Sequence, residues 1–567
     1  MGRWGAKRAG FPIVVLTVLT VAAPAPVRAA GSGTWAISHG GPAADLAHGV
    51  AVAPDGATFV GGRFSDRASF GGKTFTSAGA SDFFVAAYDA AHAHLWSFRG
   101  GGPGVDWVQD VARLPSGEVV AVGSFDTRAR IGSRLYGGQR RQLFIARVAA
   151  GRVVWAVDHG GAKDEIVNAV ATDAAGNIYI TGTMTGPASL GSRTLPHEGG
   201  TDLFVAKYDG DDGRHIWSKA FGSTGNDVGA GIAVAESGDV LVTGRISGTV
   251  PFGEQTLTAP VPTAFAMRLS GENGTHRWAR TLPATGASNG VSIAVDKAGD
   301  AVATGYFNGS TTLGAAAQSS SGSRDVFIVK LAGLTGETVW SHTAGGRGSD
   351  VPLDVAVDVA GDVFTIGSFV GSATVGGASV ASTGGLDLFL SLIDGATGAP
   401  VWASARGSRV NDRANSLVLD ANGNPIVAGF VGGATSFGTG AAVATQGGKD
   451  AFIAAFAGDD GKPVSAITTA ANSVLINVPM VQTSLVSGTA TDDRIGILRV
   501  DVTFTLPGAG VVLGTAQATM ECTEEMRKCT WTVAPPVNPG PMVVTAVSTD
   551  RANNVESPGA SVTVVNI

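Results

Sequence analysis

The stretch between Asp350 and Trp402 decides the fold, because most of the chain repeats its pattern. The pattern runs Asp350, Val355-Ala356-Val357-Asp358, Gly361-Asp362-Val363-Phe364, Asp387-Leu388-Phe389, Asp394-Gly395-Ala396-Thr397-Gly398 and Trp402. Tryptophan recurs with it at Trp35, Trp96, Trp155, Trp217, Trp278, Trp340 and Trp402, at intervals of 61, 59, 62, 61, 62 and 62 residues. A turn glycine keeps the same spacing at Gly56, Gly117, Gly176, Gly238, Gly299, Gly361 and Gly423. Two markers in step establish an internal repeat.

Each repeat predicts a small four-stranded antiparallel sheet. Short apolar segments at 353–358, 362–367, 388–393 and 400–404 have strand length, and the Gly361-Asp362 step suits a tight hairpin because glycine tolerates positive φ. Such a unit cannot bury its own faces unless it packs on its neighbours. Radially arranged four-stranded sheets are the blades of a β-propeller, so the sequence predicts an all-β propeller.

The repeats predict seven blades within residues 30–470. First-strand segments occur near Val50, Val111, Val170, Ile232, Ile293, Val355 and Leu417. The Trp35 segment precedes the first complete unit, so we expect it to close the ring as the outer strand of the last blade. The alternative is that the segment 463–470 takes that edge.

Composition fits this fold and limits the partners. The chain has 567 residues, of which 83 are glycine, 44% are hydrophobic and 15% are charged, as in a turn-rich all-β protein. A net charge of -7 over this length gives no indication of a nucleic-acid partner.

Residues 1–29 have the pattern of a secretory signal peptide. Arg3, Lys7 and Arg8 form a basic start, an apolar run follows at 11–23, and Val27-Arg28-Ala29 forms a small-x-small cleavage site. The competing interpretation is an uncleaved anchor, but the run is shorter than the roughly 20 residues that a bilayer requires. We therefore expect a secreted protein, extracellular or periplasmic, without a membrane span and monomeric.

The pattern changes near residue 471. Residues 471–567 contain about seven alternating segments, a number and length that suit an immunoglobulin-type β-sandwich. The segments 488–493 and 548–554 resemble motifs of bacterial Ig-like modules. Both cysteines of the chain, Cys522 and Cys529, flank a short turn here, which in an exported chain predicts a disulfide; two free thiols are the alternative.

The repeat itself, with Asp387-Leu388-Phe389, Asp394 to Trp402, Asp412 and Asp420-Ala421-Asn422-Gly423-Asn424, resembles the bacterial SBBP β-propeller repeat. The resemblance covers residues 31–470 and implies an exported repeat protein without an assigned reaction. Three positions depart from the pattern: Ser288 replaces an aspartate in the fifth repeat, and Gln142 and Thr263 replace the aspartate before the third strand.

Enzymatic alternatives remain open but find little support. Asp394-x-x-x-Gly398-x-x-x-Trp402 is similar to the Trp-docking motif of quinoprotein dehydrogenases, yet the propeller has no cysteine, and a turn that feeds an interblade Trp strand explains the motif. A sialidase-like Asp-box would be one residue shorter, and no carboxylate pair stands out for glycoside hydrolysis. The nine histidines lack metal-ligand spacing. We expect no cofactor, no metal and no catalytic residue.

A repeated carboxylate is the most regular polar feature. The series comprises Asp45, Asp106, Asp164, Asp227, Asp350 and Asp412. One interpretation is that these carboxylates line an axial channel and bind a calcium ion. However, aspartate ahead of a strand commonly accepts backbone N–H bonds in a turn, and Ser288 can do the same. We therefore interpret the Asp series, like the Trp series, as structural.

The second repeat carries an arginine cluster. Its members are Arg128, Arg130, Arg134, Arg140 and Arg141, with Tyr136 among them. Guanidinium groups bind carboxylate, sulfate or phosphate in a bidentate manner, so the cluster is a candidate site for an acidic polysaccharide, the alternative being a solvated charged loop. The leading hypothesis is a secreted, non-enzymatic binding protein for such a polymer or for a surface protein. The alternative is an extracellular enzyme acting on carbohydrate, or a quinoprotein-like dehydrogenase.

Overall fold

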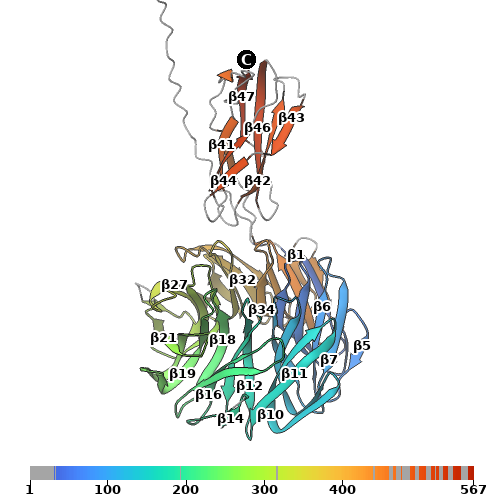
Figure 1. Cartoon of the computed structure of the whole chain (residues 1–567), viewed down its shortest axis with the longest axis vertical. Coiled ribbons are helices and arrows are strands. Elements are labelled where there is room, and N and C mark those ends of the chain that lie inside the picture. Colours follow the sequence, from blue (N-terminus) through green and yellow to red (C-terminus); the bar gives the residue numbers. More distant parts are fainter. Residues whose placement is uncertain are drawn as a thin grey trace, which may run out of the picture.

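The structure of the chain is a computed structural model, and strands are the only regular elements in the part that it describes (Figure 1). It describes residues 31–458 except 32, 192, 314–316, 439–440, together with the strand segments of the C-terminal region. The expected signal peptide, 1–29, lies outside the described residues. No helix in the described part has the length and apolarity to span a bilayer.

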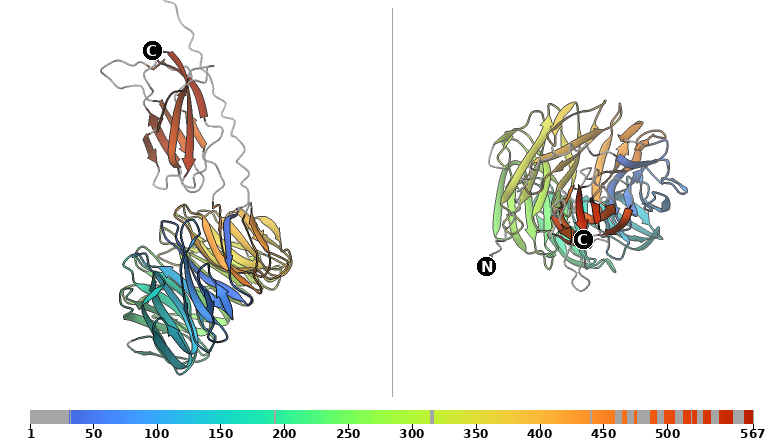
Figure 2. Two further views of the ribbon diagram at one scale, coloured as in Figure 1. Left: turned by 90° about the vertical axis from the view of Figure 1, so that its right-hand side faces the viewer. Right: turned by 90° about the horizontal axis from the view of Figure 1, so that it is seen from above.

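Small antiparallel sheets form a propeller-like arrangement around an axis (Figures 1 and 2). The first strands of the sheets are β2 (Asp45–Val52), β8 (Trp107–Arg113), β12 (Glu165–Thr172), β18 (Val228–Val234), β22 (Ser288–Val295), β28 (Val351–Val357) and β34 (Arg413–Leu419). Each first strand contacts the next in this order, and β34 contacts β2 again. The first strands therefore line the axis.

The other strands follow outward in chain order. The second strands are β3 (Thr58–Phe64), β9 (Val119–Ile131), β13 (Ile178–Met184), β19 (Val240–Phe252), β23 (Ala301–Phe307), β29 (Val363–Phe369) and β35 (Pro425–Val431). The third strands are β6 (Asp82–Tyr88), β10 (Arg134–Ala149), β16 (Asp202–Tyr208), β20 (Gln255–Leu269), β26 (Asp325–Leu331), β32 (Asp387–Ile393) and β38 (Asp450–Phe456). The outer strands are β7 (His94–Gly100), β11 (Arg152–Gly161), β17 (His215–Phe221), β21 (His276–Leu282), β27 (Thr338–Gly346) and β33 (Pro400–Arg406).

The ring closes through the N-terminal strand. β1 (Gly33–His39) pairs antiparallel with β38 and completes the sheet β1-β38-β35-β34. The expectation that the Trp35 segment is the outer strand of the last sheet is confirmed. The competing segment leaves the ring, because β39 (Val464–Ile467) pairs with β41 (Val486–Thr491) of the C-terminal region.

The cores lie between adjacent sheets. Val60 and Phe84 of one sheet are buried in a cluster with Ile426 and Ile453 of the sheet beside it. The predicted turn glycines all have positive φ, from 78° at Gly423 to 94° at Gly117. A residue with a side chain would adopt this positive φ only at a cost in free energy, so these turn positions favour glycine.

Several of the repeated tryptophans tie their sheet to the next. The indole nitrogens of Trp217, Trp278 and Trp340 donate to carbonyls of Gly271, Gly333 and Gly395, at 3.1, 2.8 and 2.9 Å. Each acceptor belongs to the turn before the outer strand of the following sheet. The motif shared with quinoproteins thus has a structural role in these three repeats.

The segment between second and third strands was left without structure by the sequence prediction. It forms small hairpins in five repeats: β4 (Arg67–Ser69) with β5 (Thr74–Thr76), β14 (Ala188–Ser189) with β15 (Thr194–Leu195), β24 (Ser310–Thr311) with β25 (Gln318–Ser319), β30 (Ser372–Val375) with β31 (Ala378–Ala381), and β36 (Thr435–Gly438) with β37 (Ala441–Val443). In the other two repeats β9–β10 and β19–β20 continue as long hairpins.

The C-terminal strands form two further sheets. One has the order β39-β41-β45-β44, with β45 (Lys528–Val533) and β44 (Thr519–Cys522). The other has the order β40-β47-β46-β42-β43, made of β40 (Val474–Leu475), β47 (Ala560–Asn566), β46 (Gly540–Asp550), β42 (Ile497–Thr505) and β43 (Val512–Gln517).

Candidate functional site

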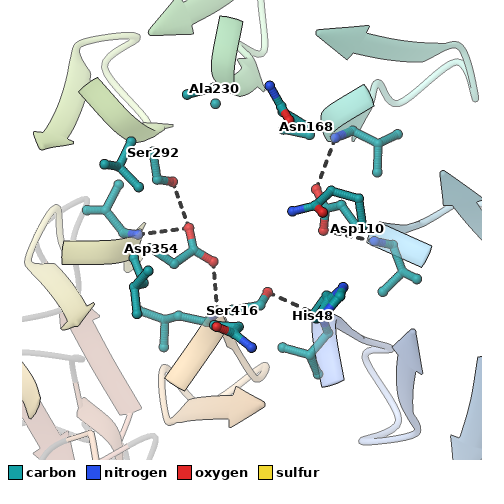
Figure 3. A pocket seen from close by; sticks show the side chains of 18 of the residues that line it. His48, Asp110, Asn168, Ala230, Ser292, Asp354 and Ser416 are labelled. Atoms are coloured by element: carbon teal, nitrogen blue, oxygen red, sulfur yellow. Dashed lines mark hydrogen bonds between the residues drawn. The ribbon is translucent and has the colours of Figure 1, made fainter. Parts of the chain in front are cut away.

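The first strands enclose a channel along the axis of the ring. It has a volume of about 670 Å³ and is lined by residues from every first strand, together with Arg63 and Phe430 of second strands. Figure 3 shows seven lining residues, one from each first strand, around a common space. A cavity of this size suits a small polar ligand or one residue of a polymer.

A β-bulge in each first strand produces the polar lining. The register between first and second strands shifts at the same place in every sheet, leaving one unpaired residue: His48, Gln109, Asn168, Ala230, Val291, Leu353 or Asn415. A bulge re-aims side chains and interrupts the alternation of inward and outward residues. Polar groups thereby reach the axis of an otherwise apolar sheet.

Asp354 is the most connected residue of the channel. Its carboxylate accepts bonds from Ser292 Oγ at 2.7 Å, from its neighbour Val355 N at 2.9 Å and from Leu417 N at 2.8 Å. Ser292 belongs to the preceding sheet and Leu417 to the following one, so a single carboxylate joins three sheets. Burial raises the pKa of Asp354, and these bonds oppose that effect.

Similar bonds join other neighbouring sheets around the axis. Asp110 accepts from Val170 N at 3.0 Å, and Asn168 Nδ2 donates to Gly229 O at 2.8 Å. Asn415 Nδ2 donates to Ala47 O at 2.7 Å. These hydrogen bonds link neighbouring sheets to one another in the middle of the channel.

His48 completes this set between the first two sheets. Its Nδ1 lies 2.9 Å from Val108 O, an acceptor, so Nδ1 carries the proton in this contact. Burial, with smaller contributions from Arg63 and Arg413, lowers the pKa of His48 to about 4. The imidazole is therefore neutral at physiological pH.

Arg63 and Arg413 form the mouth of the channel. In the sheet register Arg63 pairs with Leu46 and Arg413 pairs with Phe430, which places both arginines at the edge where the first strands begin. Burial lowers the pKa of both guanidinium groups, and Arg413 Nε is buried without a hydrogen-bond partner. No carboxylate of the described residues forms an ion pair with either arginine.

Two other arginines of the ring, Arg268 and Arg147, have partners, whereas Arg113 Nε and Arg245 Nε are buried without a hydrogen-bond partner but do not line the channel. Arg268 donates to Asp239 Oδ2 at 2.9 Å and to Gly333 O at 2.7 Å, and Arg147 donates to Gly210 O at 2.8 Å. A partly buried cation without a counter-charge is costly, so its partner is expected from outside the chain. At the mouth of the channel, therefore, the guanidinium groups of Arg63 and Arg413 lack a counter-charge from the described residues.

The carboxylates of the Asp series lie buried in turns rather than in the channel. Asp106 accepts from Gly102 N and Asp126 N, and Asp227 accepts from Ser223 N and Ser247 N. Asp45 and Asp412 make the corresponding pairs of bonds, and Asp350 accepts from Gly346 N. Each carboxylate clamps the loop that enters its sheet.

The third repeat requires a correction. Glu165, not Asp164, is fully buried and accepts the bond from Gly161 N at 3.0 Å, four residues before it. Asp164 lies one residue too far from the strand, where its carboxylate accepts from Arg141 N at 3.3 Å. In the fifth repeat Ser288 Oγ accepts from Ala264 N at 2.9 Å, as the structural interpretation of that position expects.

These carboxylates face a second series at the start of the third strands. Asp450 lies beside Asp45, and a Cβ added to Gly40 would come within 2.7 Å of an oxygen of each. Asp82 and Asp106 form an equivalent pair, as do Asp325 and Asp350. Burial raises the pKa of Asp45 and of Asp106 to about 7, with a smaller contribution from the second carboxylate.

The predicted arginine cluster does not form one patch. It lies on the long hairpin β9–β10, where Arg130 pairs with Leu135 and Arg128 with Gly137, whereas Arg134 lies on the opposite face, stacked 5.0 Å from the Tyr136 ring. The Tyr136 hydroxyl donates a hydrogen bond to Ala156 O at 2.8 Å, so this ring is packed into the sheet.

The remaining arginines of the cluster differ in their surroundings. Arg141 binds Asp126 at 2.8 Å, and Arg140 is exposed. A shallow hollow of about 660 Å³ lies on the hairpin, and Arg128 is the one cation that lines it. Because the arginines separate in this way, the hairpin is a weaker anion site than the channel mouth.

Sequence reasoning missed the channel mouth because Arg63 and Arg413 are 350 residues apart and meet only when the ring closes. In the described residues no group of three or more His, Cys, Asp and Glu side chains is placed to hold a metal ion.

Comparison with known proteins adds little. No family model matches the chain, and no curated protein matches it. A structure named as the extracellular domain of a one component system from B. thetaiotaomicron is 10% identical, with 92% of this chain and 80% of that chain covered and a TM-score of 0.22. The extracellular domain of a hybrid two component system from the same organism is 10% identical, with 92% and 68% covered and a TM-score of 0.26. At these TM-scores neither likeness carries an argument about this chain.

The carboxylate pairs predict that stability falls as pH rises through neutrality. A carboxyl whose folded pKa is raised binds a proton more tightly in the folded state, so its stabilising effect is complete below the unfolded value near 4 and is lost as pH rises through about 7. The histidines with lowered pKa, such as His48, act only below about 6.5 and in the opposite sense. Between pH 8.0 and 6.5 we therefore expect the melting temperature to rise as pH falls.

Calorimetry of a matched pair of variants checks this assignment. Asp45→Asn with Asp106→Asn should reduce the slope between pH 6.5 and 8.0, to which Asp110 and Glu165, whose pKa burial also raises to about 7, still contribute. The exposed Asp55→Asn should leave the slope unchanged. An unchanged slope in the buried double variant would remove these carboxyls as its source.

Proposed function

We propose that the chain is an extracellular, non-enzymatic binding protein whose ligand enters the channel mouth through an acidic group. The observation that carries this proposal is the pair of partly buried arginines, Arg63 and Arg413, that line the cavity without a counter-charge. Guanidinium groups match the oxygens of a carboxylate or sulfate in a bidentate manner. An anionic ligand would supply the missing partner.

The channel below the mouth favours an acidic sugar over a simple anion. The amides of Gln109, Asn168 and Asn415 line the cavity, and their oxygens can accept bonds from hydroxyl groups. This supports the acidic-polysaccharide hypothesis, with the site at the mouth in place of the hairpin cluster. A pure binding role is supported further because the channel carboxylates are engaged in joining sheets.

The architecture proposed with this function is a seven-bladed propeller followed by an Ig-like sandwich. The ring order of the first strands from β2 to β34 and back supports seven blades. The two C-terminal sheets, of four and five strands, support the sandwich. Export through the expected signal peptide, 1–29, and kinship with SBBP repeat proteins complete the proposal.

The proposed disulfide between Cys522 and Cys529 has support from strand register. The two residues are directly opposite each other in the antiparallel pair β44–β45. Opposed residues in such a pair have Cα atoms about 4.5–5.5 Å apart, within the range that a disulfide bridges. We expect non-reducing peptide mapping of the secreted protein to recover the two cysteines as one linked peptide; recovery of both as alkylated thiols without reduction would contradict the bond.

Binding of a sugar acid tests the proposed function. Isothermal titration with galacturonate should show saturable binding that galactose does not, because galactose lacks the carboxylate. Arg63→Gln and Arg413→Gln should each weaken the affinity about tenfold or more, as expected for the loss of a charge-assisted hydrogen bond.

The control is Arg152→Gln, which removes the same charge from the exposed start of the outer strand β11. It should bind as the parent does. Equal binding of galactose and galacturonate, or equal loss in all three variants, would refute a site at the mouth. Chromatographic detection of cleaved oligosaccharide would favour the enzymatic alternative.

A further inference from the structure

The channel mouth is part of a longer line of cations on one face of the ring. Lys449 Nζ lies 4.4 Å from the centre of the Phe430 ring, and Phe430 pairs in register with Arg413. Arg141 lies over the Trp107 ring at 4.9 Å. Lys449 and Arg141 each directly precede the third-strand positions Asp450 and Gln142, so they lie at the same edge of their sheets as the mouth arginines.

These four cations occupy consecutive sheets. Lys449 and Arg413 belong to the sheet of β34, Arg63 to the sheet of β2, and Arg141 to the sheet of β8, which follow one another around the ring. They form an arc, in the order Lys449, Arg413, Arg63, Arg141, along the channel mouth. This arc is defined by those four residues.

The outer cations of the arc are held in place before any ligand arrives. Stacking on an aromatic face fixes the position of a cation while its N–H groups remain available at the edge of the ring. Arg141 is held further by Asp126, whose Oδ1 accepts from Nε at 2.8 Å, which leaves the other guanidinium nitrogens for a ligand. A preorganised side chain loses less entropy on binding.

Another stacked cation, Arg324, lies at the same edge of its sheet but apart from the arc. Arg324 lies 4.8 Å from the Tyr306 ring and directly precedes Asp325, so it has the same local geometry. It belongs to the sheet of β22, which does not neighbour the sheets of the arc. The chain thus contains a matched control for the arc.

We propose that the arc binds a linear acidic polysaccharide, with one sugar acid in the channel mouth and the acid groups of neighbouring residues on Lys449 and Arg141. This proposal rests on the proposed function, because the mouth is its central subsite. A polysaccharide fits better than an acidic peptide, since the hydroxyl groups of the central residue would meet the amide oxygens of Gln109, Asn168 and Asn415 in the channel. Contacts to several linked residues raise affinity through effective concentration.

The test compares chain lengths of one polymer. Isothermal titration with galacturonate and with its hexasaccharide should show the hexasaccharide binding at least about tenfold tighter per chain. The double variant Lys449→Gln with Arg141→Gln should lose most of this gain while binding the monosaccharide as the parent does. Arg324→Gln should change neither affinity. Arg324 is stacked on Tyr306 in the same way as the outer cations of the arc are stacked on their rings, so Arg324→Gln controls for the loss of such a stack.

The outcomes separate this inference from the proposed function. Binding of the monosaccharide without any gain for the hexasaccharide, or a gain that survives the double variant, overturns the arc and leaves the mouth intact. Absence of binding by both galacturonate and hexasaccharide overturns both. Tighter binding of poly-L-glutamate than of the hexasaccharide, lost in the double variant, overturns the polysaccharide assignment in favour of an acidic polypeptide.

Discussion

The hydrogen bonds that cross between neighbouring first strands are the constraint on which the ring depends. Each small sheet exposes apolar faces that only its neighbours can cover, so the sheets are stable as a closed set. At the axis, Asp354 joins three sheets through Ser292 and Leu417, and Asn415 joins the last sheet to the first. A bulge at one fixed place in every first strand puts these groups where they can reach across.

The same constraint separates structural polar groups from those left for a ligand. Carboxylates of the Asp series, the channel carboxylates and the indole nitrogens of Trp217, Trp278 and Trp340 have partners within the chain. Arg63 and Arg413 do not, although burial lowers the pKa of both. Stability explains the first group of residues, and binding is the remaining explanation for the second.

Sequence periodicity predicted much of the fold because it follows from local rules. The spacing of tryptophan and turn glycine reveals the repeat, and the leftover Trp35 segment predicts closure through β1. Residue type was less reliable than spacing for single positions. Glu165 follows Trp155 by ten residues, the same interval as from Trp35 to Asp45, so the spacing marks Glu165, whereas the preference for aspartate led to Asp164.

The candidate site was beyond local rules. The channel lining arises at bulges, which break the alternation used to assign inward and outward residues. Five arginines close together in sequence suggested a patch, yet a hairpin sends alternate side chains to opposite faces and separates Arg130 from Arg134. The two arginines of the mouth come from the first and the last repeat of the sequence, so only closure of the ring brings them together.

The melting temperature of Arg413→Met in the absence of ligand tests most directly whether Arg413 serves binding or the stability of the ring. Methionine keeps much of the apolar stem and removes a partly buried charge that has no counter-charge, so the melting temperature should stay the same or rise. Arg268→Met, which removes bonds to Asp239 and Gly333, should lower it. A decrease of several degrees in Arg413→Met, comparable to that of Arg268→Met, would show that Arg413 is a structural residue and would contradict the assignment of the mouth as a binding site.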